Sequence, residues 1–130
     1  MTQEEKQLLL QELCGRLPYG VKVKANLFND NEVETIGTLK TINLKKDWFE
    51  FENIIAPYHL EELKPYLRPM SSMTKEERNE YHSHCNYYYG TYFDTVGSID
   101  WLNANHFDYH RLIEKGIAIE VTKDNNPYEN

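Results

Sequence analysis

Four histidines at short spacings are the residues of this chain best suited to metal chemistry. His82 and His84 lie beside Cys85, while His106 and His110 are four residues apart. An i, i+4 pair shares one helical face, as in a zincin, but the glutamate that follows the first zincin histidine is absent. Structural zinc needs four convergent ligands and catalytic zinc three, which neither pair supplies. We therefore predict no metal site and no cofactor, and keep a metal-assisted enzyme using these histidines as one alternative.

Acid–base or nucleophilic catalysis is a second possible chemistry. Asp100, His106 and Asp108 are the candidate acid–base groups, with Cys85 or a serine as the nucleophile. The chain has no GxSxG motif and no glycine-rich phosphate loop of the GxGxxG or GxxxxGK[ST] type. The sequence therefore assigns no catalytic residue, and the pattern is more typical of a protein that is not an enzyme.

A run of aromatic residues is the strongest compositional feature. Nine of the seventeen aromatic residues lie between Tyr81 and Tyr109. Tyrosine and tryptophan are enriched at protein interfaces because each combines a large rigid ring with a polar end. Consecutive tyrosines cannot all point inward from one element, which favours exposure, although the same rings could instead fill the core of the C-terminal half. The candidate binding residues are Tyr87, Tyr88, Tyr89, Tyr92 and Phe93.

A lysine-rich strand region is compatible with single-stranded nucleic acid, which binds by ring stacking with cations along its backbone. The residues concerned are Lys22, Lys24, Lys40, Lys45, Lys46, Trp48 and Phe49. Acids at positions 32, 34, 50 and 52 dilute this positive charge, and the whole chain carries a net charge of −7. Since nucleic-acid binding depends on displacing counterions with cationic surface, this function remains a second alternative.

Length and composition favour one domain with no membrane span. The chain has 130 residues, of which 40% are hydrophobic, and no apolar run approaches the roughly 18 residues of a spanning helix. Its two cysteines, Cys14 and Cys85, form no CxxC motif, which indicates a reducing compartment and hence the cytoplasm. Residues 1–70 hold eleven acids and nine bases, and residues 71–130 hold ten acids and five bases. The acidic excess is therefore concentrated in the aromatic-rich half.

The N-terminal half is predicted to be a helix followed by a small sheet. Thr2 and Glu5 form a capping box, leucines recur at helical spacing, and Pro18 ends the helix. Alternating apolar residues and turn residues then indicate short antiparallel strands, with Gly37 marking a bulge or bend. The predicted strands are residues 21–27, 33–42, 48–51 and 54–55, with turns at 29–31 and 45–47. Such strands suit a bent antiparallel sheet or an SH3-like barrel.

The C-terminal half is predicted to be mainly helical. Thr74 and Glu77 form a second capping box, which starts a helix of about ten residues. Ser98 and Asp108 are candidate caps of two further helices, and Trp101 is expected to be buried. The remaining predicted segments are one or two helical turns at 59–67, a linker at 68–73, an aromatic loop or short strand at 86–93, a final strand at 117–121 and a frayed tail at 124–130. The chain is thus one α+β domain with parts 1–67 and 74–123.

Several strings resemble a family of small uncharacterised proteins from gut Bacteroidales and their phages or mobile elements. The strings are LCGRLPYGV at 13–21, KPYLRPMSSMT at 64–74, DWLN at 100–103, HFDY at 106–109 and LIEKG at 112–116. Residues 26–60 and 80–97 carry no such string. The chain departs from the family pattern at Gly15, where Ala is usual, and at His110, where Arg is usual. The resemblance implies a bacterial or phage origin and a cytoplasmic setting, and it implies no activity.

These observations together predict a protein-binding accessory module that is not an enzyme. Its origin would be bacterial, phage or a mobile element. We expect a protein partner or self-association, and neither nucleic acid nor membrane as the partner.

Overall fold

Helix α1 (Gln3–Arg16) opens the fold that the computed structural model describes over residues 1–26 and 34–129. The Thr2 hydroxyl accepts the Glu5 N–H at 3.1 Å, and the Glu5 carboxylate accepts the Thr2 N–H at 2.8 Å. This capping box satisfies two amides that the first helical turn leaves without partners. A 3₁₀ turn, η1 (Leu17–Tyr19), contains Pro18 and ends the helix. The prediction of this helix is confirmed.

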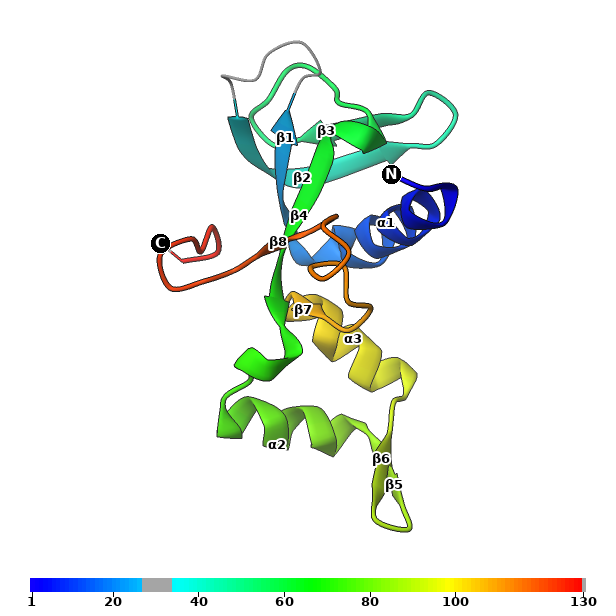
Figure 1. The fold of residues 1–130 in the computed structure, drawn as a ribbon, viewed down its shortest axis with the longest axis vertical. Coiled ribbons are helices and arrows are strands. Elements are labelled where there is room, and N and C mark those ends of the chain that lie inside the picture. Colours follow the sequence, from blue (N-terminus) through cyan, green and yellow to red (C-terminus); the bar gives the residue numbers. More distant parts are fainter. Residues whose placement is uncertain (27–33, 130) are drawn as a thin grey trace.

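A mixed sheet lies against α1 (Figure 1). Its strand order is β3-β2-β1-β4-β7, and β8 also pairs with β4. The pairs β3–β2, β2–β1 and β1–β4 are antiparallel, whereas β7 and β8 run parallel to β4. The strands are β1 (Lys22–Asn26), β2 (Glu34–Asn43), β3 (Trp48–Phe51), β4 (Leu63–Pro69), β7 (Phe107–Asp108) and β8 (Ile119–Glu120).

The α+β class is confirmed, but the SH3-like barrel is not, since no sheet closes within the described residues. The predicted turn at 45–47 is present, and the one at 29–31 lies outside the described residues. A strand at 54–55 is wrong, because this segment is irregular and the Ile55 side chain is fully exposed.

Strand β4 replaces most of the helical turns predicted at 59–67, of which one turn is present at 60–62. The linker predicted at 68–73 is wrong, because its residues belong to the end of β4 and to a 3₁₀ turn. Only two short 3₁₀ turns, η2 (Leu60–Glu62) and η3 (Met70–Ser72), flank the strand. Pro65, Tyr66 and Leu67 are all buried, so the strand lacks the alternation that marks a half-exposed one. Pro65 is tolerated because β4 pairs with β1 up to this residue, and its other side pairs only from Tyr66 onward.

Gly37 lies in regular pairing opposite Val23, so the bulge predicted there is misplaced. The register shift lies between Leu39 and Thr41 instead. A Cβ added at Gly37 would meet Ile54 Cδ1 at 2.8 Å and Phe51 Cβ at 3.1 Å. Gly37 is therefore required by a close approach of side chains.

Helices α2 (Lys75–His84) and α3 (Val96–Ala104) form the C-terminal half together with a hairpin of β5 (Asn86–Tyr88) and β6 (Thr91–Phe93). The α2 capping box of Thr74 and Glu77 is confirmed. Helix α3 begins earlier than predicted, because Thr95 is its N-cap and Ser98 is the third helical residue.

The helix predicted after Asp108 is wrong. The segment forms successive turns, in which the Asp108 carboxylate accepts the N–H groups of Leu112 and Ile113 at 2.9 Å each. Arg111 has a φ of 61°, a left-handed conformation that a continuous right-handed helix cannot contain.

Two clusters of buried side chains divide the interior. The larger cluster joins Leu9 and Leu13 of α1 to the inner face of the sheet. The smaller cluster is centred on Trp101, Leu102 and Phe107. The Trp101 ring stacks on Phe107 at 5.6 Å and on Tyr81 at 5.9 Å, which joins α3 to β7 and α2.

The described end of the chain returns to the sheet through Tyr128, in the segment where the sequence predicts fraying. The Tyr128 hydroxyl donates to the Tyr66 carbonyl at 2.7 Å and accepts the Lys22 N–H at 3.0 Å. The ring also stacks on His106 at 3.8 Å. Burial raises the pKa of the Tyr128 hydroxyl, so this docked phenol stays protonated.

Replacing Trp101 by Ala should lower the free energy of unfolding by about 3–5 kcal/mol, because its ring fills the centre of the smaller cluster. Thermal and urea unfolding measure this loss. Val96→Ala in the same helix is the control, since Val96 is 81% exposed. A Trp101→Ala protein that melts within a degree or two of wild type would contradict this packing.

Candidate functional site

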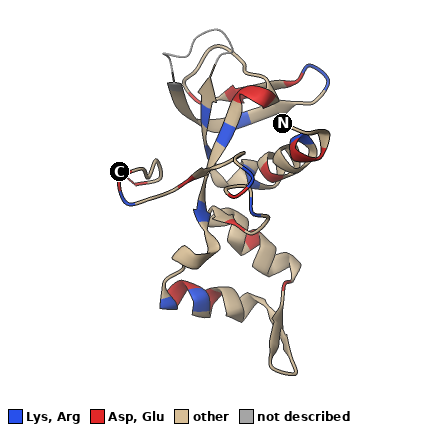
Figure 2. Cartoon of the chain, viewed as in Figure 1, with Lys and Arg blue, Asp and Glu red and all other residues tan. Residues whose placement is uncertain are grey.

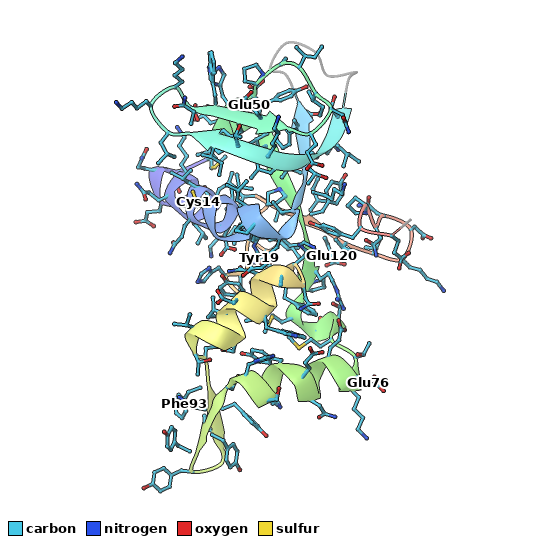
Figure 3. All side chains as sticks on the ribbon, turned by 180° about the vertical axis from the view of Figure 1, so that it is seen from behind. Cys14, Tyr19, Glu50, Glu76, Phe93 and Glu120 are labelled. Carbon is cyan, nitrogen blue, oxygen red and sulfur yellow. The ribbon has the colours of Figure 1, made fainter. Side chains whose placement is uncertain are left out.

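The aromatic hairpin, β5 and β6 with the turn between them (residues 86–93), projects from the C-terminal half. Figure 1 shows it beyond α2 and α3, at one end of the long axis of the molecule. Figure 3 places Phe93 of the hairpin far from Glu50 of β3. The hairpin therefore meets solvent on most sides.

A tight turn of two residues closes the hairpin. Tyr89 and Gly90 have φ values of 50° and 80°, and the strands pair Tyr88 with Thr91 directly across the turn. Two left-handed residues in succession are typical of a type I′ turn, whose twist matches the flanking strands. Glycine fits this conformation, whereas a bulky residue such as Tyr89 adopts it at a steric cost.

Aromatic side chains occupy both faces of the hairpin. Tyr87 and Tyr92 lie directly opposite each other on one face, with ring centroids 4.8 Å apart. Tyr88 and Phe93 share the other face at 6.3 Å. The exposed fractions are Tyr87 60%, Tyr88 58%, Tyr89 104%, Tyr92 46% and Phe93 52%. The structure thus leaves every residue of the predicted binding set exposed.

The base of the hairpin is fixed to both flanking helices. The Thr95 hydroxyl donates to the His84 carbonyl at 2.7 Å, and the Tyr81 hydroxyl donates to the Asp94 carboxylate at 2.6 Å. The His82 ring stacks on Tyr92 with centroids 3.7 Å apart. A contact surface held in one arrangement loses less entropy on binding than a flexible loop does.

A bidentate ion pair holds α2 against the sheet. Arg68 of β4 donates to both carboxylate oxygens of Glu77, at 2.7 and 2.8 Å. The Arg68 guanidinium also lies 4.2 Å from the Phe107 ring centroid. Hydrogen bonding from Arg68 lowers the pKa of Glu77 to about 2. This pair therefore links the position of the hairpin to the central strand.

Charge is absent from the hairpin. Residues 81–93 contain no Asp, Glu, Lys or Arg, and Figure 2 shows the hairpin without charged colouring, next to a strongly charged α2. The protein around it carries a net charge of −7. The aromatic hairpin is thus a neutral patch on an acidic molecule.

The four candidate histidines do not converge on a metal site. His82 stacks on Tyr92, and the Nδ1 of His110 contacts the Glu12 carboxylate. His106 has a left-handed backbone, and burial, with Arg16 and Arg68 nearby, lowers its pKa to about 4. Over the described residues, no group of three or more His, Cys, Asp or Glu is placed to hold a metal ion.

Two of the candidate catalytic groups, Asp108 and Cys85, make structural contacts. Asp108 is 6% exposed, and its carboxylate caps the turn after β7. Cys85 is the C-cap of α2, and its Sγ contacts the Tyr81 carbonyl at 3.4 Å.

The lysine-rich strands do not present the rings that a nucleic-acid platform needs. Phe49 is buried, and Trp48 is 38% exposed with the Lys46 ammonium 4.6 Å from its ring centroid. The Lys22 ammonium donates to the Thr38 hydroxyl. One exposed ring beside lysines offers little stacking surface.

Two ion pairs outside the hairpin were not identified from the sequence. One is the Arg68–Glu77 pair, and the other is a buried pair of Glu12 and Arg16 at i, i+4 spacing in α1. The sequence signal for the second pair was the i, i+4 spacing of Glu12 and Arg16 beside the leucine stripe of α1.

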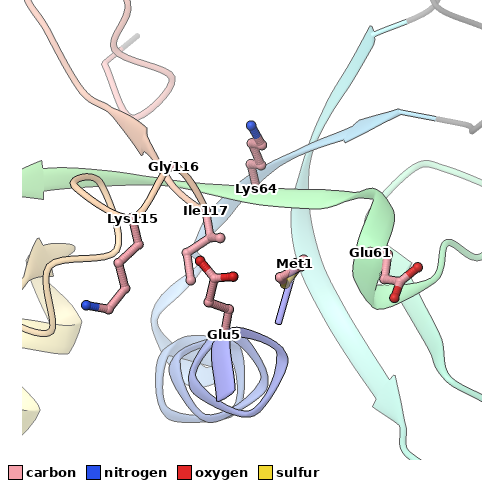
Figure 4. A pocket seen from close by; sticks show the side chains of 7 residues that line it. All are labelled: Met1, Glu5, Glu61, Lys64, Lys115, Gly116 and Ile117. Atoms are coloured by element: carbon pink, nitrogen blue, oxygen red, sulfur yellow. The ribbon is translucent and has the colours of Figure 1, made fainter. Parts of the chain in front are cut away.

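Four hollows on the described surface are lined by residues outside the hairpin. The one in Figure 4 has a volume of about 410 Å³ and lies between the start of α1, β4 and the turn at residues 115–117. Two acids and two bases line this hollow, namely Glu5, Glu61, Lys64 and Lys115. Glu61 forms an ion pair with Lys6, which does not line the hollow. This hollow presents no convergent set of groups for catalysis.

No family model, curated protein or solved structure matches this chain. Among the described helices, none is long and apolar enough to cross a membrane.

Replacing Glu77 by Gln should reduce stability in a pH-dependent way. Because the pKa of Glu77 falls from 4.5 to about 2 in the folded state, its ionised form stabilises the fold above about pH 4.5, and this contribution is lost as the pH falls towards 2. Urea unfolding from pH 2.5 to 7 should show a wild-type advantage that shrinks with acidification. Glu80→Gln on the same helix is the control. If the difference in unfolding free energy between wild type and Glu77→Gln does not change with pH, ionised Glu77 does not stabilise the fold in this way.

Replacing Tyr89 by Asn should stabilise the hairpin, by up to about 1 kcal/mol, because Asn-Gly is a preferred type I′ sequence. Hydrogen exchange at the Tyr88 and Thr91 amides measures the local effect. Gly90→Ala is the control with the opposite expected effect. It should destabilise the hairpin, because alanine is strained at the Gly90 φ of 80°. If these amides exchange faster in Tyr89→Asn than in wild type, the Tyr89 ring itself stabilises the turn.

Proposed function

We propose that this protein is a protein-binding module that is not an enzyme, and that the aromatic hairpin is its contact surface. The observation that carries the proposal is the exposure of five aromatic side chains on an uncharged hairpin whose base is held by α2 and α3. Exposed aromatic anchors on a preorganised element are typical of interface hot spots.

The composition of the hairpin supports a protein as the ligand. Its residues are Asn, Tyr, Gly, Thr and Phe, close to the Tyr, Ser, Gly and Asn that dominate antibody paratopes. Tyrosine contributes a large contact area with few rotatable bonds, and its hydroxyl can donate or accept a hydrogen bond.

The conformation of Tyr89 gives a second reason. This side chain is fully exposed and its backbone is left-handed, so it adds no buried surface and strains the turn. Strained residues that do not stabilise a fold are concentrated at functional sites. A tyrosine at this position is explained if its ring contacts a partner.

The setting of this module is also a proposal. The strings that resemble proteins of gut Bacteroidales and their phages lead us to place it in the bacterial cytoplasm, as an accessory protein of bacterial, phage or mobile-element origin. A host protein is the kind of partner that such an accessory protein would bind.

Replacing both Tyr88 and Tyr89 by Ser should leave the free energy of unfolding within about 0.5 kcal/mol of wild type, because both side chains are exposed. The same change should weaken partner binding by more than about 2 kcal/mol. The matched control is Leu44→Ser/Ile55→Ser, which removes two apolar side chains, 65% and 100% exposed, that lie outside the hairpin.

The measurement is capture from a Bacteroides lysate on immobilised wild-type, hairpin-variant and control proteins, with thermal unfolding of each. We expect a stoichiometric protein on the wild type and the control that is missing from the hairpin variant. Equal capture by all three would count against the proposed surface, as would a wild type that captures no stoichiometric protein and does not self-associate.

A further inference from the structure

We infer that a second copy of this chain binds the aromatic hairpin, so that two molecules join hairpin to hairpin about a twofold axis. This inference rests on the proposed function, because it takes the same surface and names its occupant. The contact would be isologous, with the same patch contributed by both molecules.

Charge is the first argument for a second copy. Two molecules of net charge −7 repel each other through most of their surfaces. The run from 81 to 93, which holds no Asp, Glu, Lys or Arg, provides a patch where two copies can meet without opposing like charges. A partner of opposite charge would instead favour a surface that carries acids.

The unpaired edges of the hairpin also favour a second copy. Within the described residues β5 and β6 pair only with each other, so each strand has one unpaired edge. Neither strand contains a charged residue or proline, the devices that commonly prevent edge-to-edge pairing. The strands are only three residues long, so an edge contact adds few hydrogen bonds, and the rings must supply most of the buried area.

Area is the third argument. A buried aromatic side chain contributes about 200 Å², and one partner can cover one face of the hairpin together with its turn. Tyr88, Tyr89 and Phe93 then offer about 430 Å² per molecule. Two molecules bury about 860 Å², an area typical of weak interfaces below about 1,200 Å². An interface of this size supports a weak dimer, with a dissociation constant of about 100 μM.

The position of the hairpin determines the shape of the dimer. Because it lies at one end of the long axis, two joined hairpins place the sheets at opposite ends of the complex (Figure 1). The acids of α2 and α3 still flank the joined hairpins, and salt screens their repulsion, with a Debye length of about 10 Å at 0.1 M salt. Added salt should therefore leave the dimer intact or strengthen it.

Sedimentation equilibrium of the purified chain from about 1 to 500 μM, at low and high salt, tests the inference; this range brackets the expected dissociation constant. We expect a monomer–dimer equilibrium, and X-ray scattering of the dimer should show a maximum dimension nearly twice that of the monomer. Tyr88→Ser/Phe93→Ser removes the two rings of the face that His82 does not cover. It should weaken the dimer at least about 30-fold, as expected for hot-spot residues.

Two further variants keep this test decisive. Tyr89→Asn removes the ring from a turn that asparagine suits, so it should fold normally and still weaken the dimer. Leu44→Ser/Ile55→Ser should dimerise as wild type does. A wild type that stays monomeric at about 500 μM, or hairpin variants that dimerise like the control, would overturn the inference. Lysate capture tests the proposed function separately. If the wild type is monomeric but captures a protein that the hairpin variant does not capture, the hairpin is still a protein-binding surface.

Discussion

The buried ion pair between Glu12 and Arg16 is the interaction on which the rest of the structure depends. The Arg16 side chain is fully buried, and its Nε donates to the Glu12 carboxylate at 2.9 Å. The same guanidinium donates to the Phe107 carbonyl at 2.5 Å and lies 5.3 Å from the Tyr109 ring centroid. Removing one partner of a buried pair is costly because the other charge stays buried without compensation. This pair therefore holds α1 against β7, the strand that follows α3.

Phe107 connects the two halves of the molecule for the same reason. Its carbonyl accepts from Arg16, its ring stacks on Trp101, and the Arg68 guanidinium lies over the same ring. Arg68 in turn holds Glu77 of α2. Two arginines, one from the helix and one from the central strand, thus meet at a single residue. Their planar groups can each combine hydrogen bonds with a ring contact, which a lysine could not reproduce.

The aromatic hairpin is rigid at its base and exposed at its turn because of this construction. The smaller cluster fixes α2 and α3, and the bonds of Tyr81 and Thr95 fix the two ends of the hairpin. Nothing in the described chain covers Tyr89, which retains a left-handed backbone. A scaffold that is stable elsewhere can tolerate such strain, and strain of this kind is common where a protein meets a ligand.

Local sequence patterns predicted those elements whose stabilising contacts join residues close in the sequence. Both capping boxes, Thr2 with Glu5 and Thr74 with Glu77, are local hydrogen-bonded units, so their helices were predicted near their true starts. The alternation from residue 21 predicted β1, because one face of that strand is buried and the other is not. The tyrosine run predicted a candidate binding segment, since its composition alone is unusual.

Tertiary structure decided the elements whose stability comes from distant partners. Strand β4 is buried at Pro65, Tyr66 and Leu67 because β1, β7 and β8 pair with it, and burial on both faces removes the alternation that identifies a strand. The turns after Asp108 replace a helix, because the Asp108 carboxylate bonds two N–H groups and Arg111 is left-handed. The sequence by itself determined which residues of the hairpin are aromatic and uncharged. Only the packing of α2 and α3 decided that those rings face solvent, because exposure depends on which neighbours the folded chain brings near.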